Sequence, residues 1–127
     1  MAALALLGLP LLFAGPTTDQ RPATMTVQAS EGELSLGAQL ELAEDPSHQW
    51  TIETLTAASS KAGFALHGNS APYLGFSRST WWLRVTLHNP SNKPMRRLVE
   101  FGFPLLDEVT LYAQRRQGLE RLGQSGF

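Results

Sequence analysis

The sequence lacks cysteine and has few charged residues, and both features exclude classes of protein. It is 127 residues long, with no cysteine, 17% charged residues and a net charge of −1. Without cysteine, the chain can form neither a disulfide framework nor a thiolate metal site. Nucleic-acid binders usually carry a basic patch. Here the short basic groups at residues 93–97 and 115–116 are typical of solvated strand ends. We therefore expect no nucleic-acid partner.

Local motifs of catalysis and cofactor binding are also missing. There is no glycine-rich phosphate loop, and His48, His67 and His88 are scattered without HxH or HExxH spacing. The serines carry no nucleophile signature. A carboxylate pair for glycoside cleavage could come from distant strands, but the sequence selects no such pair. We therefore predict no catalytic residue, no metal ligand and no cofactor, so that the chain itself is not an enzyme.

Long hydrophobic runs are scarce, and the longest one lies at the N-terminus. Residues 1–15 are nearly all apolar, and no charged residue precedes Asp19. Such a run is too short for a helix across a bilayer, which needs about 20 residues, but it is typical of the apolar part of a secretory signal. A core helix is the alternative, although glycine and proline interrupt it repeatedly. We predict an export signal at residues 1–15, a linker at residues 16–23 and one domain at residues 24–127.

What remains predicts a mainly β domain with one short helix. The clearest strand is residues 81–89, where the alternating sequence gives one apolar face: Trp81, Leu83, Val85 and Leu87. Further strands are expected at residues 24–28, 64–66, 97–103 and 108–113. Thr51 is a suitable N-cap for a helix that ends near Gly63. Short strands separated by frequent turns are typical of a β-sandwich or jelly roll.

The second face of the 81–89 strand is the candidate binding surface. It carries Trp82, Arg84 and His88, of which the first and last lie about 20 Å apart at strand spacing. Tyr73 and Arg78, on the preceding loop, would close one end of this strip. The alternative is structural: Trp82 packs under a loop, and Arg84 stacks on it or forms an ion pair.

Two polar residues near strand ends are expected to have structural roles. Asp107 shares the parity of the apolar residues that follow it, so its carboxylate needs a partner at the edge of the core. That partner could be Arg84, Arg97 or backbone N–H groups of the adjacent turn. Asn89 begins an Asn-Pro-Ser-Asn turn, where asparagine side chains commonly bond the local backbone.

Two segments together resemble a known family. These are residues 74–94, LGFSRSTWWLRVTLHNPSNKP, and residues 103–112, FPLLDEVTLY. Their order and spacing resemble the type 2 extracellular domain of bacterial seven-transmembrane receptors with diverse intracellular signalling modules (7TMR-DISM). The family pattern is matched by Leu74, Gly75, Phe76, Ser77, Trp82, Leu83, Arg84, Asn89, Pro90, Ser91, Pro104, Leu105, Leu106, Asp107 and Val109.

The resemblance implies a periplasmic domain with a jelly-roll fold like that of carbohydrate-binding modules. Such a domain normally precedes seven membrane helices and a diguanylate cyclase, histidine kinase or phosphatase output. The family domain continues beyond residue 127, so we expect this chain to be truncated at its C-terminus and the output to lie outside it.

The resulting hypothesis is a ligand-sensing domain of a receptor in the inner membrane. The expected partners are a small molecule, which could be a carbohydrate, the membrane region of the same receptor and a second copy in a homodimer. Two alternatives remain open: a dimerisation module without a ligand, and a fragment of a secreted carbohydrate-active enzyme.

Overall fold

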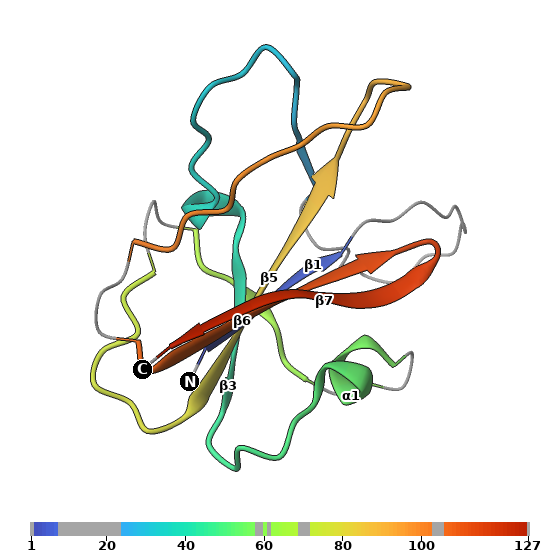
Figure 1. Ribbon diagram of the computed structural model, residues 1–127. Helices are drawn as coiled ribbons and strands as arrows, with labels where there is room; N and C mark the ends of the chain where they lie inside the picture. The colour runs from blue at the N-terminus through green and yellow to red at the C-terminus, as the bar shows by residue number, and fades with distance from the viewer. Residues whose placement is uncertain are drawn as a thin grey trace, which may run out of the picture.

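A computed structural model describes residues 24–57, 60, 62–68, 72–102 and 106–126, together with the backbone of residues 2–7. The chain is mainly β, and its strands form one curled, seven-stranded sheet (Figure 1). The strands are β1 (Ala2–Leu7), β2 (Thr24–Thr26), β3 (Glu41–Asp45), β4 (Ala65–Leu66), β5 (Thr80–His88), β6 (Glu108–Arg115) and β7 (Gly118–Gly126). This architecture is consistent with the predicted β-sandwich class.

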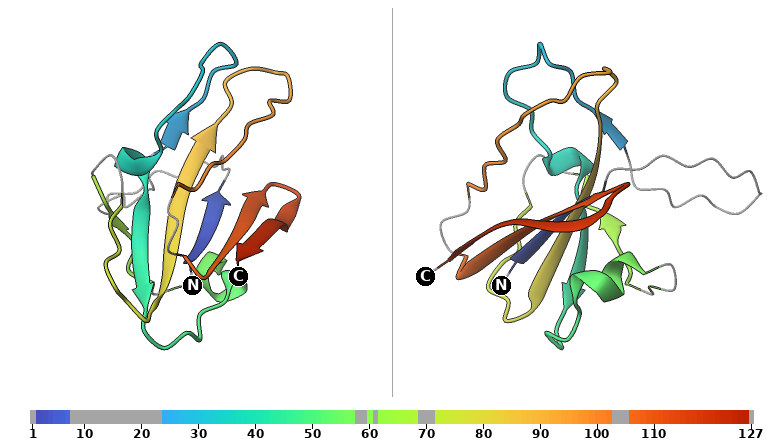
Figure 2. Two further views of the ribbon diagram at one scale, coloured as in Figure 1. Left: turned by 60° about the vertical axis from the view of Figure 1, so that its left-hand side comes forward. Right: turned by 45° about the vertical axis from the view of Figure 1, so that its right-hand side comes forward.

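Strand order places the long β5 near the middle of the sheet. The order is β4-β3-β5-β1-β6-β7, and β2 pairs with the C-terminal end of β5, residues 86–88. Strand β3 runs antiparallel to β5, whereas β1 runs parallel to both β5 and β6 and lies between them. Figure 2 shows β6 and β7 curling away from the plane of β3 and β5.

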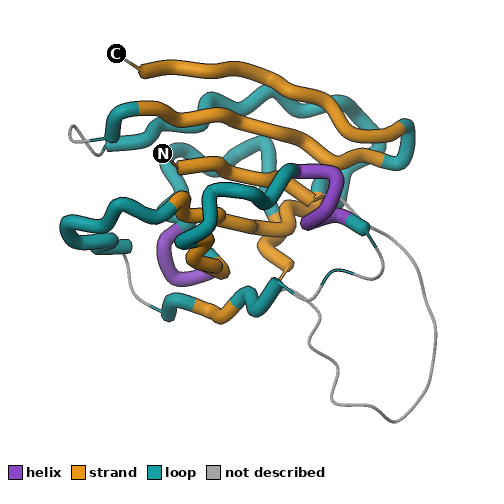
Figure 3. The backbone as a smooth tube through the Cα atoms, turned by 90° about the horizontal axis from the view of Figure 1, so that it is seen from below, coloured by secondary structure: helices purple, strands orange, loops and turns teal. Residues whose placement is uncertain are grey.

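Both faces of β5 are packed, because loops cover one face and a helix covers the other (Figure 3). Leu83 and Val85 are fully buried in a cluster with Leu40 on one face. On the opposite face, Trp82 packs with Ala43 and Ile52. The alternation of β5 therefore separates two cores. The face that carries Trp82 and Arg84 is covered at these two residues and exposed at His88.

The helix of this second core is short. Helix α1 (Ile52–Thr56) begins at Thr51, whose hydroxyl accepts a hydrogen bond from the Thr54 backbone N–H, while the Thr54 hydroxyl accepts one from the Thr51 N–H. This reciprocal pair satisfies two backbone donors that the helix start leaves unpaired. The predicted N-cap is confirmed, but the predicted end near Gly63 is wrong, since α1 ends at Thr56.

Two further expectations differ from the structure or lie partly outside it. The predicted strand at residues 97–103 is wrong over its described part, because residues 97–102 form no strand. Of the N-terminal run, only residues 2–7 are described, as β1. The export signal stays a prediction, and residues 8–23 lie outside the described residues. No helix within the described ranges is long and apolar enough to span a membrane.

Candidate functional site

Trp82, the first residue of the predicted strip, lies in the second core. It is only 4% exposed, and its ring stacks near that of Tyr112 on β6, with ring centroids 6.5 Å apart and planes 26° apart. An indole packed between two strands and a helix contributes mainly to stability. This placement corresponds to the structural alternative for Trp82, and its role in ligand binding stays a prediction.

Arg84 is held by a partner that the sequence did not indicate. Its Nε donates to Glu41 Oε2 at 3.0 Å and its Nη2 donates to Oε1 at 2.9 Å, in the two-point geometry that makes arginine–carboxylate pairs strong. Its guanidinium also lies 4.1 Å from the ring centroid of Phe64. The arginine thus joins β5 to β3 and stacks on Phe64, not on Trp82 or against Asp107.

His88 and Asn89 lie where β5 ends. The His88 side chain is exposed, and its carbonyl accepts a hydrogen bond from the Val27 N–H at 2.8 Å. Asn89 Nδ2 donates to the Lys93 carbonyl at 2.7 Å, and its Oδ1 accepts from the Ser91 N–H at 3.0 Å. Asn89 therefore organises the turn that follows β5, while His88 lies apart from the covered Trp82 and Arg84.

The two remaining predicted ligand residues, Tyr73 and Arg78, line one cavity together. The cavity, which we call the aromatic cavity, has a volume of about 480 Å³, within the range of small-molecule sites. Its lining also includes Phe76, Trp81 and Asp107. The structure thus brings Tyr73 and Arg78 to one site, next to Trp81 from the apolar face of β5 and Asp107 from the start of β6.

Two aromatic side chains of the aromatic cavity are largely exposed. Tyr73 is 76% exposed and Phe76 is 99% exposed. Trp81 Nε1 is buried without a hydrogen-bond partner among the described residues, as is Trp82 Nε1 in the second core. Leaving a buried donor unpaired costs about 1–3 kcal/mol. The exposed rings of Tyr73 and Phe76 are therefore the part of the lining that a ligand can reach.

Two serines fix the loop that carries Tyr73, Phe76 and Arg78. Ser79 Oγ donates to Glu44 Oε1 at 2.7 Å, and Ser77 Oγ donates to the same oxygen at 3.3 Å. Glu44 belongs to β3, so the contacts tie the loop to the sheet. Sequence reasoning missed this role of the serines because Glu44 lies more than 30 residues away in the chain.

Asp107 lies at the rim of the aromatic cavity and is exposed. The two arginines considered as its partners are engaged elsewhere: Arg84 with Glu41, and Arg97 with the carbonyl oxygens of residues 28, 31 and 32. Its backbone lies close to the β7 end, because a Cβ built on Gly126 would come within 2.4 Å of the Asp107 carbonyl oxygen. Only glycine fits at position 126 without a shift.

The described residues hold no group of three or more His, Cys, Asp or Glu side chains that could bind a metal ion. The arrangement is instead an aromatic surface with one cation, one carboxylate and one unpaired indole N–H. A lining of aromatic and apolar side chains with a few polar groups is typical of small-molecule sites.

Comparison with known proteins identifies the family of this domain. No curated protein and no solved structure matches the chain. The family model for 7TMR-DISM extracellular 2 matches residues 37–127, well over half of the sequence. The chain therefore belongs to the 7TMR-DISM extracellular 2 family, the periplasmic sensor domains of seven-transmembrane receptors with diverse intracellular signalling modules.

Proposed function

We propose that this domain binds a carbohydrate in the aromatic cavity and reports its presence to the membrane region of the same receptor. Family membership supports the sensor role. The observation that carries the ligand class is the pair of exposed rings, Tyr73 and Phe76, in one cavity with the charged groups of Arg78 and Asp107. The output, such as a diguanylate cyclase or histidine kinase, would lie outside this chain.

A sugar complements these groups in two ways. Its C–H faces pack on aromatic rings such as those of Tyr73 and Phe76. Its hydroxyl groups accept hydrogen bonds from the Arg78 guanidinium and donate them to the Asp107 carboxylate. A fully apolar ligand would leave these polar groups unpaired, and a strongly charged one would face both a cation and an anion.

The attachment of the loop gives a route from ligand to sheet. Ser77 and Ser79 connect the cavity loop to Glu44 on β3, and Thr80 Oγ1 lies 2.9 Å from His48 Nδ1 in the turn after β3. A ligand that orders the loop would therefore also stabilise the β3–β5 pairing. This coupling is part of the proposal.

Calorimetric titration of this chain with a panel of mono- and oligosaccharides tests the proposal. We expect saturable binding of at least one sugar, weakened at least fivefold by Tyr73→Ala and by Phe76→Ala, since aromatic contacts are worth about 1 kcal/mol or more. Both side chains are exposed, so the variants should keep their unfolding midpoint. Leu66→Ala, which removes an exposed apolar side chain on β4, is the matched control. A silent panel, or binding that neither aromatic variant weakens, would refute the proposal.

A dimerisation module is the second candidate, and one observation favours it. Strand β7 lies at the end of the sheet order, and all nine of its residues are exposed. Such an edge can pair with a second chain. A concentration-dependent dimer in sedimentation experiments, together with a silent sugar panel, would support this role instead.

A further inference from the structure

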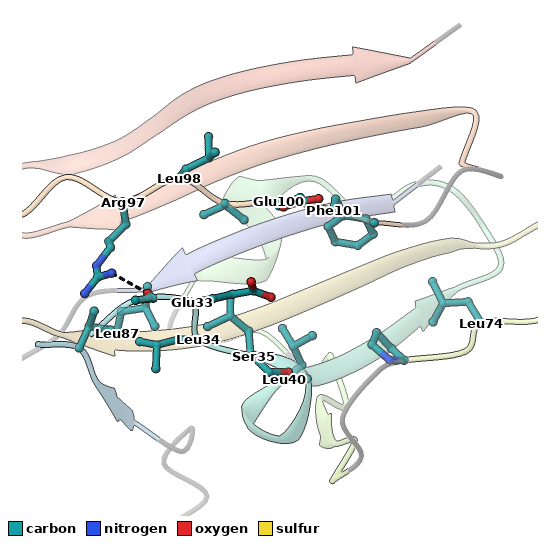
Figure 4. A pocket seen from close by; sticks show the side chains of 17 residues that line it. Glu33, Leu34, Ser35, Leu40, Leu74, Leu87, Arg97, Leu98, Glu100 and Phe101 are labelled. Carbon is teal, nitrogen blue, oxygen red and sulfur yellow. Dashed lines mark hydrogen bonds between the residues drawn. The ribbon is translucent and has the colours of Figure 1, made fainter. Parts of the chain in front are cut away.

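A second and larger cavity lies against the same apolar face of β5, near Leu87, whereas the aromatic cavity lies near Trp81. Its volume is about 620 Å³, and two chain segments without regular structure, residues 32–36 and 97–102, form its walls (Figure 4). Its apolar lining includes Leu34, Leu36, Leu40, Leu87, Val99 and Phe101. We call it the leucine cavity.

The leucine cavity continues the first core of the domain. Leu40 is buried with Leu83 and Val85, and Leu36, Leu87, Val99 and Phe101 pack against that cluster. At the mouth, Leu98 is 93% exposed. Apolar surface left in water is unfavourable by about 25 cal/mol per Å², so an aliphatic group that covered Leu98 and entered the cavity would gain free energy.

Arg97 holds the two walls together. Its Nη1 donates to the carbonyls of Glu31 at 2.7 Å and Gly32 at 3.0 Å, and its Nη2 donates to the carbonyl of Gln28. The guanidinium is therefore turned toward the backbone of the opposite wall, as Figure 4 shows. Its hydrogen bonds are used to keep the cavity shape, which makes it a poor partner for an anionic ligand.

The free charges of the lining are both negative. Glu33 comes from one wall and Glu100 from the other, and both side chains are exposed. Among the described residues neither carboxylate has an ion-pair partner. Two unpaired carboxylates beside an apolar interior complement a cation attached to an aliphatic chain.

From this combination we infer that the leucine cavity is a second ligand site, which binds a linear amphiphile with a cationic head group. The aliphatic chain lies among the leucines, and the head group lies between Glu33 and Glu100. This site adjoins the aromatic cavity at Leu74, and the two linings otherwise share no residue.

Three ten-carbon probes, each below its micelle concentration, test the inference by calorimetry on this chain. The probes are decyltrimethylammonium, decyl maltoside and decanoate. We expect saturable binding of one decyltrimethylammonium per chain, weaker binding of decyl maltoside and the weakest binding of decanoate. Equal or tighter binding of decanoate, or uptake that does not saturate at one molecule, would overturn the proposal.

Variants at exposed positions separate head-group recognition from the apolar contribution. Glu33→Gln and Glu100→Gln should each weaken decyltrimethylammonium binding about two- to fivefold, the range of exposed charge pairs, and leave decyl maltoside unchanged. Glu53→Gln, an exposed acid on α1, should change neither. Leu98→Ser should weaken all three probes and preserve the unfolding midpoint. Binding that is insensitive to both glutamates, or to Leu98, would show that the probes bind elsewhere.

Discussion

Arg84 on β5 and Glu41 on β3 are direct partners in the antiparallel register of the two strands, and two hydrogen bonds join their side chains. Both side chains are mostly covered, with 20% and 10% of their surfaces exposed. Phe64 covers the guanidinium from one side. The arginine of the Trp-Leu-Arg motif is therefore part of the framework, because it connects two neighbouring strands inside a largely covered face.

A double-mutant cycle with Arg84→Met and Glu41→Gln should give a coupling free energy of about 1.5–3 kcal/mol in urea unfolding, the range for hydrogen bonds to charged groups. The control is the pair of Arg115 and Glu120, 3.6 Å apart with both side chains 59% exposed. Exposed pairs contribute little, so its cycle should give less than about 1 kcal/mol. Equal coupling in the two cycles would contradict the framework role of Arg84.

Thr86 is a buried residue whose substitution is expected to stabilise the domain. It is 3% exposed, and its hydroxyl is buried without a partner among the described residues. Thr86→Val removes that unsatisfied hydroxyl with little change of shape and should stabilise the domain by about 1 kcal/mol. Thr54→Val is the contrast, because Thr54 takes part in the cap of α1, and its loss should destabilise by about 1 kcal/mol. Unfolding curves that show destabilisation by Thr86→Val would mean that its hydroxyl has a partner in solution.

The sequence predicted the local features of this fold well. The alternation in residues 81–89 corresponds to β5, and the Thr51 cap marks the start of α1. The Asn89 turn likewise forms from a short-range signal. The strand, the helix cap and the turn each depend on residues close together in the chain, so hydrophobic periodicity and turn-forming residues predict them directly.

The remaining features depend on distant partners. Glu41, which pairs with Arg84, lies 43 residues away in the sequence, so the polar face of β5 suggested an open strip rather than a covered core. Arg97 likewise bonds carbonyls 65 to 69 residues away, and that contact accompanies an irregular segment where a strand was expected. The position of β1 between β5 and β6 carries no local signal at all.

Strand β1 supplies a prediction about the sheet itself. Because it is the only strand between β5 and β6 in the described sheet order, its removal would leave two facing rows of unpaired backbone groups. Ala5→Pro would remove one donor and introduce a residue that central strands do not tolerate. We expect faster amide hydrogen exchange in β5 and β6, whereas exchange in β3 should change least. Unchanged exchange in β6 would show that β1 does not occupy this position in solution. That result is also expected if residues 1–15 are an export signal that is removed.

The turn that follows β3 depends on a single carboxylate. Asp45 has no exposed surface. Its Oδ1 accepts hydrogen bonds from the Ser47 hydroxyl at 2.5 Å and the Ser47 N–H at 3.0 Å, and its Oδ2 accepts one from the Trp50 N–H at 2.9 Å. Burial alone would raise the pKa of Asp45, but these hydrogen bonds and one from the His48 backbone outweigh it, so that the pKa is lowered from its ordinary value of 3.8.

The lowered pKa fixes how stability changes with pH. A carboxyl whose pKa is lower in the folded state stabilises the fold fully above its unfolded pKa, and that stabilisation disappears as the pH falls through the folded pKa. Asp45→Asn should cost about 1–3 kcal/mol at neutral pH, because its amide donor would face the Trp50 N–H. The difference from the parent should stay constant down to about pH 5 and shrink below about pH 4. Asp107→Asn, at an exposed carboxyl, is the control and should cost far less at neutral pH. Urea unfolding at several pH values measures both, and a difference for Asp45→Asn that grows on acidification would contradict the assigned role.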